Sequence, residues 1–596
     1  AYIDALTATE VYIEDQQGDT LIYVEKLNAD YKLFKFKNDE IPFDKVEVHQ
    51  ATVAIGMHSE SADLNIQFLT DYFSPPGPST RDQPQVIRFD QVTITDTRFN
   101  YFNEKYNPPS SRAFDENNML FYEINGHLHD FEIIGDSLHF KLNDISGKEK
   151  SGLEIVNLST LATISSTVME YDNLTLLTPK SEIGNYLRFD YSSYGDFSDF
   201  IAEVPIIARL DNAMVHTADL ALFSHTLAAY NELVSATGEV AGTIDQLNSQ
   251  AIDLSVGTHT RFIGRAKLTG LPDIEQTIFD LDASSFATTA KDVVTLAAIE
   301  SAPLQLLAAG KIGFQGSFLG TIYDFVAQGS ITSDVGPLLV DLTLKLPDDA
   351  TPRYNGTVSS KLFRLGKLMG DTLLGNASFS LKIDGVGFSQ NTLNSKVSGN
   401  VYQLQYANYD YQNISVSGYF SENLFTGNGG IKDPNFDLSF SGKLDLTEKL
   451  PLIRIATNVE AINLKQLGLD SLDNILQFTG DIDLVGSNLD NLVGQIHLDS
   501  FLLNRSGREY ALKDISLVAK TTNNKKHYDL NTDFARATIS GDFVPSELGL
   551  VVQHIKHIIY PEAWPLPPDS TFTQNIAIEL VASDYKPLLK EYLGNI

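Results

Sequence analysis

Apolar and polar residues alternate with a period of two along most of this chain. Val92–Thr95, Asp341–Leu346 and Phe436–Phe440 are clear examples. Because successive side chains of a β-strand point to opposite faces, such a segment gathers its apolar side chains on one face. Gly, Asn, Asp or Ser generally follow these segments, as hairpin turns require. The pattern predicts a mainly β fold built as an antiparallel meander.

The alternation also predicts which residues share the apolar face of the strands. A shift of one residue exchanges the two faces, so alternation alone does not say which face is the inner one. The residues that it predicts as the lining of a groove are Val92, Ile94, Leu342, Leu344, Leu346, Phe379, Leu381, Ile383, Phe436, Leu438, Phe440, Ile482, Leu484, Ile496 and Leu498.

Two internal repeats have their apolar and polar positions in phase. The segment 43–53 matches the segment 89–99, at an offset of 89 − 43 = 46 residues. The segment 409–418 resembles 510–519, at an offset of 510 − 409 = 101 residues. Repetition at fixed offsets indicates one structural unit used several times. We expect a hairpin unit that grows in one direction.

The length of the chain limits how the apolar face can be hidden. With 596 residues, the chain is far longer than one hydrophobic core supports. Alternation by itself favours a closed sandwich, in which two sheets cover each other. Length, repetition and the shortage of helices favour instead an elongated, repeating β-groove (a β-taco) with a few short helices. If each strand with its turn takes about 14 residues, the chain holds about 40 strands.

Helical periodicity is confined to three segments. Thr217–Val234 places Leu220 and Phe223 on one face behind an expected N-cap at Thr217, and Ser546–Tyr560 stops before a proline. A third segment, Thr295–Ala309, contains Pro303. These elements suggest β-groove repeats over 1–210, repeats with helical inserts over 211–310, further groove repeats over 311–545, and a helix with a final strand over 546–596.

Charge and composition exclude several classes of function. The 43 basic residues stand against 77 acidic ones, for a net charge of −34, so the chain lacks the basic surface that nucleic acids require. It has no Cys, which rules out disulfides, Cys–zinc sites and thiol catalysis. There is no run of about 18 apolar residues and no signal peptide at Ala1. The strand-like start favours a segment trimmed of its anchors.

No catalytic motif stands out. The chain has no G-x-x-x-x-G-K-[ST], G-x-S-x-G or H-E-x-x-H pattern. Asp481, Asp483 and Gly486 are spaced like the start of a calcium loop, but Leu492 stands where a bidentate Glu is needed. Solvated surfaces explain the remaining clusters better than metal or acid–base sites: His127 with His129 and His139, His554 with His557, and the acidic segment 190–199. The sequence therefore predicts a non-enzymatic protein without metal or cofactor.

Several stretches resemble the TamB/AsmA-like family of translocation and assembly module proteins. The run Val11–Leu21 (VYIEDQQGDTL) is similar to the start of these proteins, and Asn463–Leu469 (NLKQLGL) is similar to an element near their end. The other stretches that resemble the family are Ile41–Val48, Ala51–Val53, Asn65–Phe68, Gly242–Leu247, Thr260–Phe262 and Gly270–Asp273. No single motif is specific, but their order and phase along the chain agree.

The resemblance implies a segment of a larger, inner-membrane-anchored protein in the periplasm of a Gram-negative-type cell. In this family, a hydrophobic groove carries the acyl chains of phospholipids between the inner and outer membranes. A further region, outside this segment, engages an outer-membrane β-barrel partner. Such a role needs an apolar lining and no catalytic residue.

Two other functions remain open at this stage. The strand edges could serve as a scaffold or chaperone for the assembly of outer-membrane β-barrel proteins, by pairing with client strands. The chain could also be an adhesin or surface fibre with a closed core. A lipid carrier requires an open apolar face, and a fibre requires that face to be packed.

Overall fold

Strands dominate the structure, as the alternation predicts. A computed structural model describes residues 5–31, 40–61, 63–73, 86–105, 114–134, 137–223, 227–228, 230–296, 304–347, 350–388, 392–523, 525–565 and 574–583. These residues form 30 strands, arranged as an open meander with a few short helices. The estimate of about 40 strands was too high because individual strands reach 18 residues.

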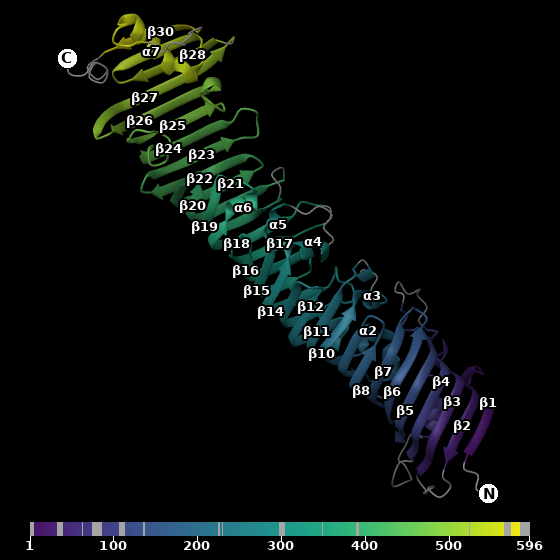
Figure 1. Ribbon diagram of the computed structural model, residues 1–596. Coiled ribbons are helices and arrows are strands. Elements are labelled where there is room, and N and C mark those ends of the chain that lie inside the picture. The colour runs from purple at the N-terminus through teal and green to yellow at the C-terminus, as the bar shows by residue number, and fades with distance from the viewer. Residues whose placement is uncertain are drawn as a thin grey trace. The chain divides into compact units, whose positions relative to one another are not determined.

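The chain divides into two compact units, Ala1–Asp334 and Val335–Ile596. Unit 1 contains the strands β1 to β16 and unit 2 contains β17 to β30. This division is coarser than the four segments expected from the sequence, which stay a prediction. Within each unit the strands follow one another in chain order (Figure 1).

The strands of unit 1 vary from 9 to 18 residues in length. They are β1 (Ala5–Glu14), β2 (Thr20–Tyr31), β3 (Glu40–Met57), β4 (Val86–Asn103), β5 (Asn118–Ile134), β6 (Ser137–Glu149), β7 (Glu154–Ile164), β8 (Val168–Leu177), β9 (Glu182–Asp190), β10 (Ile206–His216), β11 (Leu233–Thr243), β12 (Gln246–Val256), β13 (Thr260–Thr269), β14 (Ile278–Thr289), β15 (Lys311–Gly320) and β16 (Asp324–Ser333). Its helices are α1 (Gln67–Phe73), η2 (Tyr194–Asp199), α2 (Phe200–Glu203), α3 (Thr217–Leu220), α4 (Ala290–Leu296) and α5 (Leu304–Ala308).

The 46-residue repeat corresponds to one parallel strand pair. β3 and β4 run parallel, and every paired residue of β4 lies 46 positions after its partner in β3. The rings of Phe43 and Phe89 therefore stack, with centroids 5.0 Å apart. The hairpin expected from this repeat was wrong, because parallel strands need a crossover connection, and α1 lies within it. The other described pairs of unit 1 are antiparallel.

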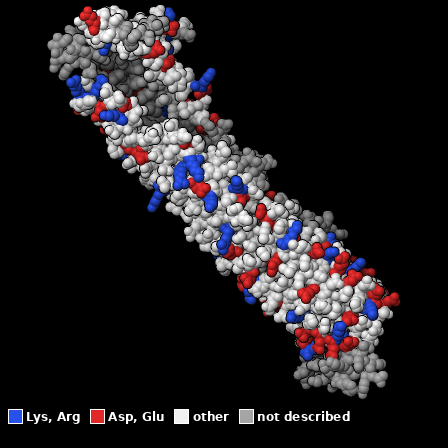
Figure 2. Space-filling view, in the orientation of Figure 1, with Lys and Arg blue, Asp and Glu red and all other residues white. Residues whose placement is uncertain are grey.

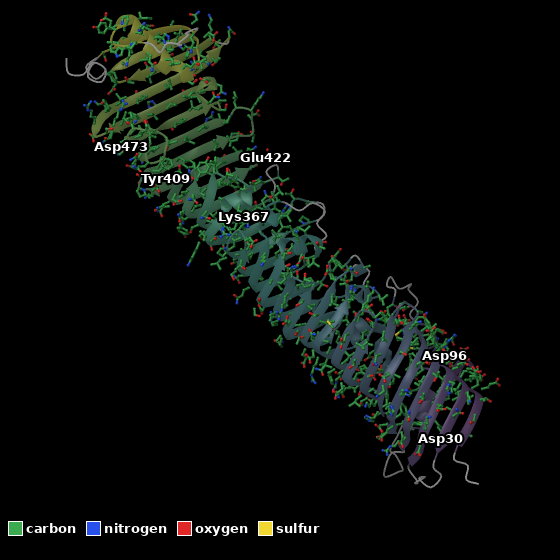
Figure 3. The ribbon with its side chains drawn as sticks, in the orientation of Figure 1. Asp30, Asp96, Lys367, Tyr409, Glu422 and Asp473 are labelled. Atoms are coloured by element: carbon green, nitrogen blue, oxygen red, sulfur yellow. The ribbon has the colours of Figure 1, made fainter. Side chains whose placement is uncertain are left out.

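Exposed polar residues with a left-handed backbone, with φ between 48° and 55°, recur in strands between β1 and β10 of unit 1. Among them are Glu10, Gln50, Asp96, Glu123, Asp144, Asn173 and Asn212. The strand register shifts at the last five of these seven, as it does at a β-bulge, whose extra residue bends the strand. The register is unbroken at Glu10 and Gln50. Asp96, labelled in Figure 3, accepts a hydrogen bond from Gln50 Nε2 at 3.1 Å, which joins β4 to β3.

Unit 2 is an antiparallel meander in which each described strand pairs with its neighbours in sequence. Its strands are β17 (Leu338–Lys345), β18 (Arg353–Arg364), β19 (Leu374–Val386), β20 (Asn394–Tyr406), β21 (Tyr409–Ser421), β22 (Leu424–Asp433), β23 (Phe436–Asp445), β24 (Leu452–Asn463), β25 (Asn474–Val485), β26 (Val493–Arg505), β27 (Arg508–Thr522), β28 (Lys525–Thr532), β29 (Ala535–Asp542) and β30 (Asn575–Ala582). Its helices are α6 (Leu365–Met369), η4 (Leu489–Asn491), η5 (Pro545–Glu547) and α7 (Leu548–Ile559). The 101-residue repeat relates β21 to β27, six strands further on.

Of the three predicted helices, the structure confirms one, contradicts one and divides the third. The one expected over Ser546–Tyr560 is confirmed by η5 and α7. The one expected over Thr217–Val234 was wrong: α3 ends at Leu220, its N-cap is His216, and β11 begins at Leu233. Phe223 packs instead on the ring of Phe114, at 4.8 Å, a tertiary contact that outweighs helical periodicity. The third is split between α4 and α5, and residues 297–303 lie outside the described part of the chain.

A buried ionic cluster holds the crossover between β3 and β4. Asp15, in the β1–β2 turn, has a fully buried side chain. It accepts hydrogen bonds from His58 Nε2 at 2.9 Å and from Asn65 Nδ2 at 3.1 Å. His58 Nδ1 lies 3.3 Å from Glu104 Oε2. Because carboxylates at this spacing accept hydrogen bonds from both ring nitrogens, the geometry favours the imidazolium form of His58.

The same contacts shift the pKa values of both groups. Burial by itself would raise the pKa of Asp15, but hydrogen bonds from His58, Asn65 and backbone amides lower it to about 2. The hydrogen bond to Asp15, with a smaller contribution from Glu104, raises the pKa of His58. A raised histidine pKa stabilises the fold below the unfolded value of about 6.5, and this stability is lost as pH rises through the folded pKa. The lowered pKa of Asp15 stabilises the fold above the unfolded value of about 4. Between about pH 4 and about pH 6.5, both groups therefore stabilise the fold.

We predict that His58→Gln destabilises unit 1 by about 3 kcal/mol at pH 6, because it leaves the buried Asp15 carboxylate without its cation. The difference from the unchanged protein should shrink as the pH rises through the raised pKa of His58, because the imidazolium then loses its proton. Amide hydrogen exchange of the segment around His58, followed against pH in both proteins, measures this. A difference that stays constant from pH 5 to pH 9 contradicts the assigned charge state.

Glycine is required where a strand adopts a conformation that side chains exclude. Gly399 of β20 has φ +142°, and a Cβ there would collide with the carbonyl oxygen of Ser380 on β19. We predict that Gly399→Ala destabilises unit 2 by about 1–3 kcal/mol. Gly430→Ala in β22 is the matched control, because its nearest contact would be 3.3 Å away and φ there is not positive. Thermal unfolding of the two variants tests this, and equal losses would contradict it.

Candidate functional site: an apolar sheet face

One row of facing residues crosses all fourteen strands of unit 2 without a polar side chain. Residues opposite each other on neighbouring strands share a face of the sheet. From β17 to β30 this central row consists of Leu342, Gly356, Ile383, Val397, Gly418, Gly427, Gly442, Ile455, Ile482, Ile496, Leu517, Leu530, Ala537 and Leu580.

A flanking row two residues away extends the same apolar face. Its single polar aliphatic side chain is Ser395, whose buried hydroxyl has no hydrogen-bond partner. The row consists of Leu344, Tyr354, Gly385, Ser395, Phe420, Phe425, Leu444, Ile453, Leu484, Gly494, Ala519, Tyr528, Ile539 and Ile578. The rings of Phe420 and Phe425 lie 4.8 Å apart, so the apolar contact passes directly from strand to strand.

The opposite face of unit 2 is polar over the same strands. The row between the two apolar ones begins with Thr343, Asn355, Asp384 and Lys396, and it includes the Arg454–Asp483 ion pair at 3.0 Å. Tyr419 and Val518 are its exceptions. On the side of the molecule displayed in Figure 2, acidic and basic side chains are interspersed rather than gathered in one patch. The sheet of unit 2 is therefore amphipathic from strand to strand.

An apolar row also runs through twelve strands of unit 1. From β5 to β16 the corresponding row has apolar side chains and glycines only, and each residue in it is partly exposed. Its members are Ile133, Leu138, Ile164, Met169, Phe189, Ile206, Gly242, Leu247, Leu268, Phe279, Gly320 and Phe325. Each unit thus carries its own continuous apolar face.

The apolar faces are neither buried in a core nor fully exposed. In the central row only Gly418 is buried and most other members are half-buried. Exposure rises toward β30, the last described strand, to 59% at Leu580. Most apolar residues that are buried anywhere in the described chain are alanines and valines, whereas a two-sheet core buries large side chains. The described residues therefore leave these faces without a second layer.

The predicted groove residues lie in both units. Those in the strands of unit 2 all share the apolar face: Leu342, Ile383, Ile482 and Ile496 lie in the central row, Leu344 and Leu484 in the flanking row, and Phe379, Leu381, Phe436, Leu438, Phe440 and Leu498 in the adjoining rows. In unit 1, Val92 faces Val46 and Leu128, and Ile94 faces Val48. Leu346 lies just beyond the end of β17. Their role as a groove lining stays a prediction.

A hollow of about 940 Å³ lies in unit 2, between β22 and β27. Residues of the central row and of the two rows beside it line this hollow. Lys443, Arg454, Asp483, Gln495 and His497 are among its lining residues. Since Arg454 and Asp483 already neutralise each other there, this hollow offers no concentrated charge for a ligand.

Two groups of side chains among the described residues have a spacing compatible with a metal ion. One is Asp15 with Asp19 and His58, and the other is the exposed set His497, Asp499 and Asp514. In the first group, hydrogen bonds already satisfy both oxygens of Asp15. The second has no buried support, which a metal ligand usually receives. We therefore interpret both groups as clusters of ion pairs.

The predicted histidine and calcium-type clusters lie on ordinary surface elements. His127 and His129 share a face of β5, and His127 and His139 each contact a threonine hydroxyl on a neighbouring strand. Asp481 and Asp483 lie within β25 rather than in a loop.

The acidic segment 190–199 contains η2. Tyr191, Tyr194, Phe197 and Phe200 pack there as one aromatic cluster.

Sequence reasoning missed the cluster of Asp15, His58, Asn65 and Glu104. Its members lie up to 89 positions apart (104 − 15 = 89), so no local spacing connects them. The only local signal is the turn sequence Asp15–Asp19, in which Asp15 caps two backbone amides. Pairing of β3 with β4, which the 46-residue repeat encodes, is what brings His58 next to Glu104.

No helix among the described residues is long and apolar enough to cross a bilayer. Comparisons with protein-family models, with curated proteins and with solved structures found no match to this chain.

Proposed function

We propose that this chain holds the acyl chains of phospholipids along the apolar faces of its two units and serves their transfer between membranes, without a catalytic step. The observation that carries the proposal is the unbroken central row of unit 2, which runs through fourteen strands without a charged or polar side chain. The similar row of unit 1 supports it.

The energetics of such a face favour acyl chains. Each CH₂ group moved from water onto an apolar surface contributes about 0.8 kcal/mol when fully buried. Because the row residues are already half-buried by their neighbours, an acyl chain completes their burial while its polar head stays in water. Because the row has no charges or strong hydrogen-bonding groups, no position along it binds a lipid much more tightly than the others. An acyl chain can therefore move along the row.

The resemblance to the TamB/AsmA-like family supports the same proposal. The similar stretches fall on successive parts of the sheet: Val11–Leu21 covers the β1–β2 hairpin, and Asn463–Leu469 covers the turn between β24 and β25. On this basis we propose a periplasmic location, with a segment outside this chain anchored in the inner membrane and another engaging an outer-membrane β-barrel.

The second candidate is a scaffold for β-barrel assembly. The observation that favours it is β30, the last described strand of unit 2, where Leu580 and Val581 on opposite faces are both more than half exposed. A client strand could pair with this edge. Cross-linking from β30 that captures unfolded barrel protein, and no lipid from the interior strands, would favour this candidate over the first.

We predict that the chain, purified from cells without detergent, carries several phospholipids, measured by native mass spectrometry with lipid extraction. Val416→Asp, on the apolar face of β21, should lower the bound lipid several-fold, because a carboxylate among Gly399 and Gly429 cannot remain charged under an acyl chain. Ile482→Asp should do the same from β25.

Ser417→Asp is the matched control, since Ser417 is the next residue of β21 and lies on the polar face between Ser398 and Asn428. It should keep the lipid of the unchanged protein. Circular dichroism and thermal unfolding identify variants that remain folded. Equal lipid content in folded Val416→Asp, Ile482→Asp and Ser417→Asp variants would refute the proposal.

A further inference from the structure

The helix α7 presents an apolar stripe that the sheet does not cover. At 100° per residue, six of its seven apolar residues fall within about a third of the helix circumference, and Leu550 lies on the other side. Of these, Val551 is buried at 3% exposure, whereas Ile558 and Ile559 are 77% and 73% exposed. The stripe consists of Leu548, Val551, Val552, Ile555, Ile558 and Ile559. The exposed part of the stripe lies in the second half of the helix.

Contacts with the sheet and with η4 hold the start of α7, whereas the most exposed residues of the apolar stripe lie in the second half of the helix. The Ser546 amide and hydroxyl donate to Asp490, at 2.8 and 3.0 Å, which joins η5 to η4. Phe543 and Pro545 are buried just before the helix, and the ring of Phe543 packs edge-on against Tyr528 at 5.5 Å. The exposed stripe is thus held at a defined place beside the last strands of unit 2, rather than on a loose tail.

The charge of this segment differs from that of the rest of the chain. The whole chain has 77 acidic and 43 basic residues, yet no carboxylate occurs from Leu548 to Pro561. The polar side of the helix carries Lys556 and two histidines instead. A surface that bound a basic protein would need carboxylates here, and this one has none.

Aromatic residues follow directly after the exposed stripe. The ammonium group of Lys556 lies 5.8 Å from the centre of the Trp564 ring, and a ring nitrogen of His557 lies 2.9 Å from the Trp564 carbonyl oxygen. Tyr560 packs edge-on against Trp564 at 6.4 Å. Tyr and Trp beside Lys, at the border of an apolar helical stripe, have the composition of elements that lie in the interface of a lipid bilayer.

From these observations we infer that α7 is a membrane-docking helix, which inserts its apolar stripe into the surface of a phospholipid bilayer and so places the β30 end of unit 2 against it. The lipid-holding role of the sheet is not required for this docking. Because attraction comes from apolar burial rather than from charge, and the chain as a whole is acidic, docking should favour neutral over anionic membranes.

Flotation of the whole chain with phosphatidylcholine vesicles tests the inference. The unchanged protein should float with the vesicles, and raising NaCl from about 0.05 to about 0.5 M should not release it. The double variant Ile558→Ser/Ile559→Ser should lower the partition coefficient at least about tenfold. Both side chains are exposed, so the substitutions leave the packing of unit 2 unchanged.

The matched control is Leu304→Ser/Leu469→Ser, which removes two equally exposed leucines, at 79% and 71%, far from α7 in the sequence. It should float like the unchanged protein. Flotation of the α7 double variant at the level of this control overturns the inference. A second outcome also overturns the inference: the unchanged protein does not float, but it forms a dimer that the α7 double variant does not form. The apolar stripe would then be a contact between two copies of the chain.

The two proposals can fail separately. Ile482→Asp should lose its bound lipid and still float, since α7 is intact. A chain that carries lipid but does not float would leave the lipid-holding role standing and refute the docking helix.

Discussion

The ladder of backbone hydrogen bonds between neighbouring strands is the interaction on which the rest of this structure depends. In a sheet that grows strand by strand, the register of each pair decides which side chains face each other. An error of one residue in one pair would turn a whole strand over and insert charged side chains into the apolar row. Across the fourteen strands of unit 2 the register brings Leu342, Ile482 and Leu580 into one line, although 238 residues (580 − 342) separate the first from the last.

Local irregularities keep that register while allowing the sheet to curve. The bulge at Asp96 adds a residue to β4, and its polar side chain is exposed. Gly399 adopts a backbone that other residues exclude, and it lies between Leu381 and Val416 on the apolar face. The buried pair of Asp15 and His58 fixes the single parallel crossing among the described strands of unit 1. The bulge and the glycine restrict which residues the sequence can place there, whereas the Asp15–His58 pair stabilises the fold. Each of these features serves the continuity of the apolar face.

Much of this face could be predicted from alternation, because a period of two follows directly from strand geometry. Val416, Ile455 and Leu517 were not singled out, yet they obey the same rule and lie in the apolar rows. What alternation could not supply was long-range pairing. The 46-residue repeat was visible in the sequence, but a hairpin and a parallel pair give the same pattern, and only the crossover through α1 separates them. For the same reason the contact of His58 with Glu104 was missed, and the apolar spacing of Thr217–Val234 indicated a helix where Phe223 packs on Phe114.

Photo-cross-linking from consecutive residues of one strand tests the central claim most directly. A photoreactive amino acid is placed in turn at Asp481, Ile482, Asp483 and Leu484 of β25, in cells that contain labelled phospholipid. Occupation of the apolar face predicts lipid adducts at Ile482 and Leu484 and none at Asp481 and Asp483, a period of two that matches the strand. Adducts of equal yield at all four positions, or adducts to protein alone at Ile482 and Leu484, would contradict it.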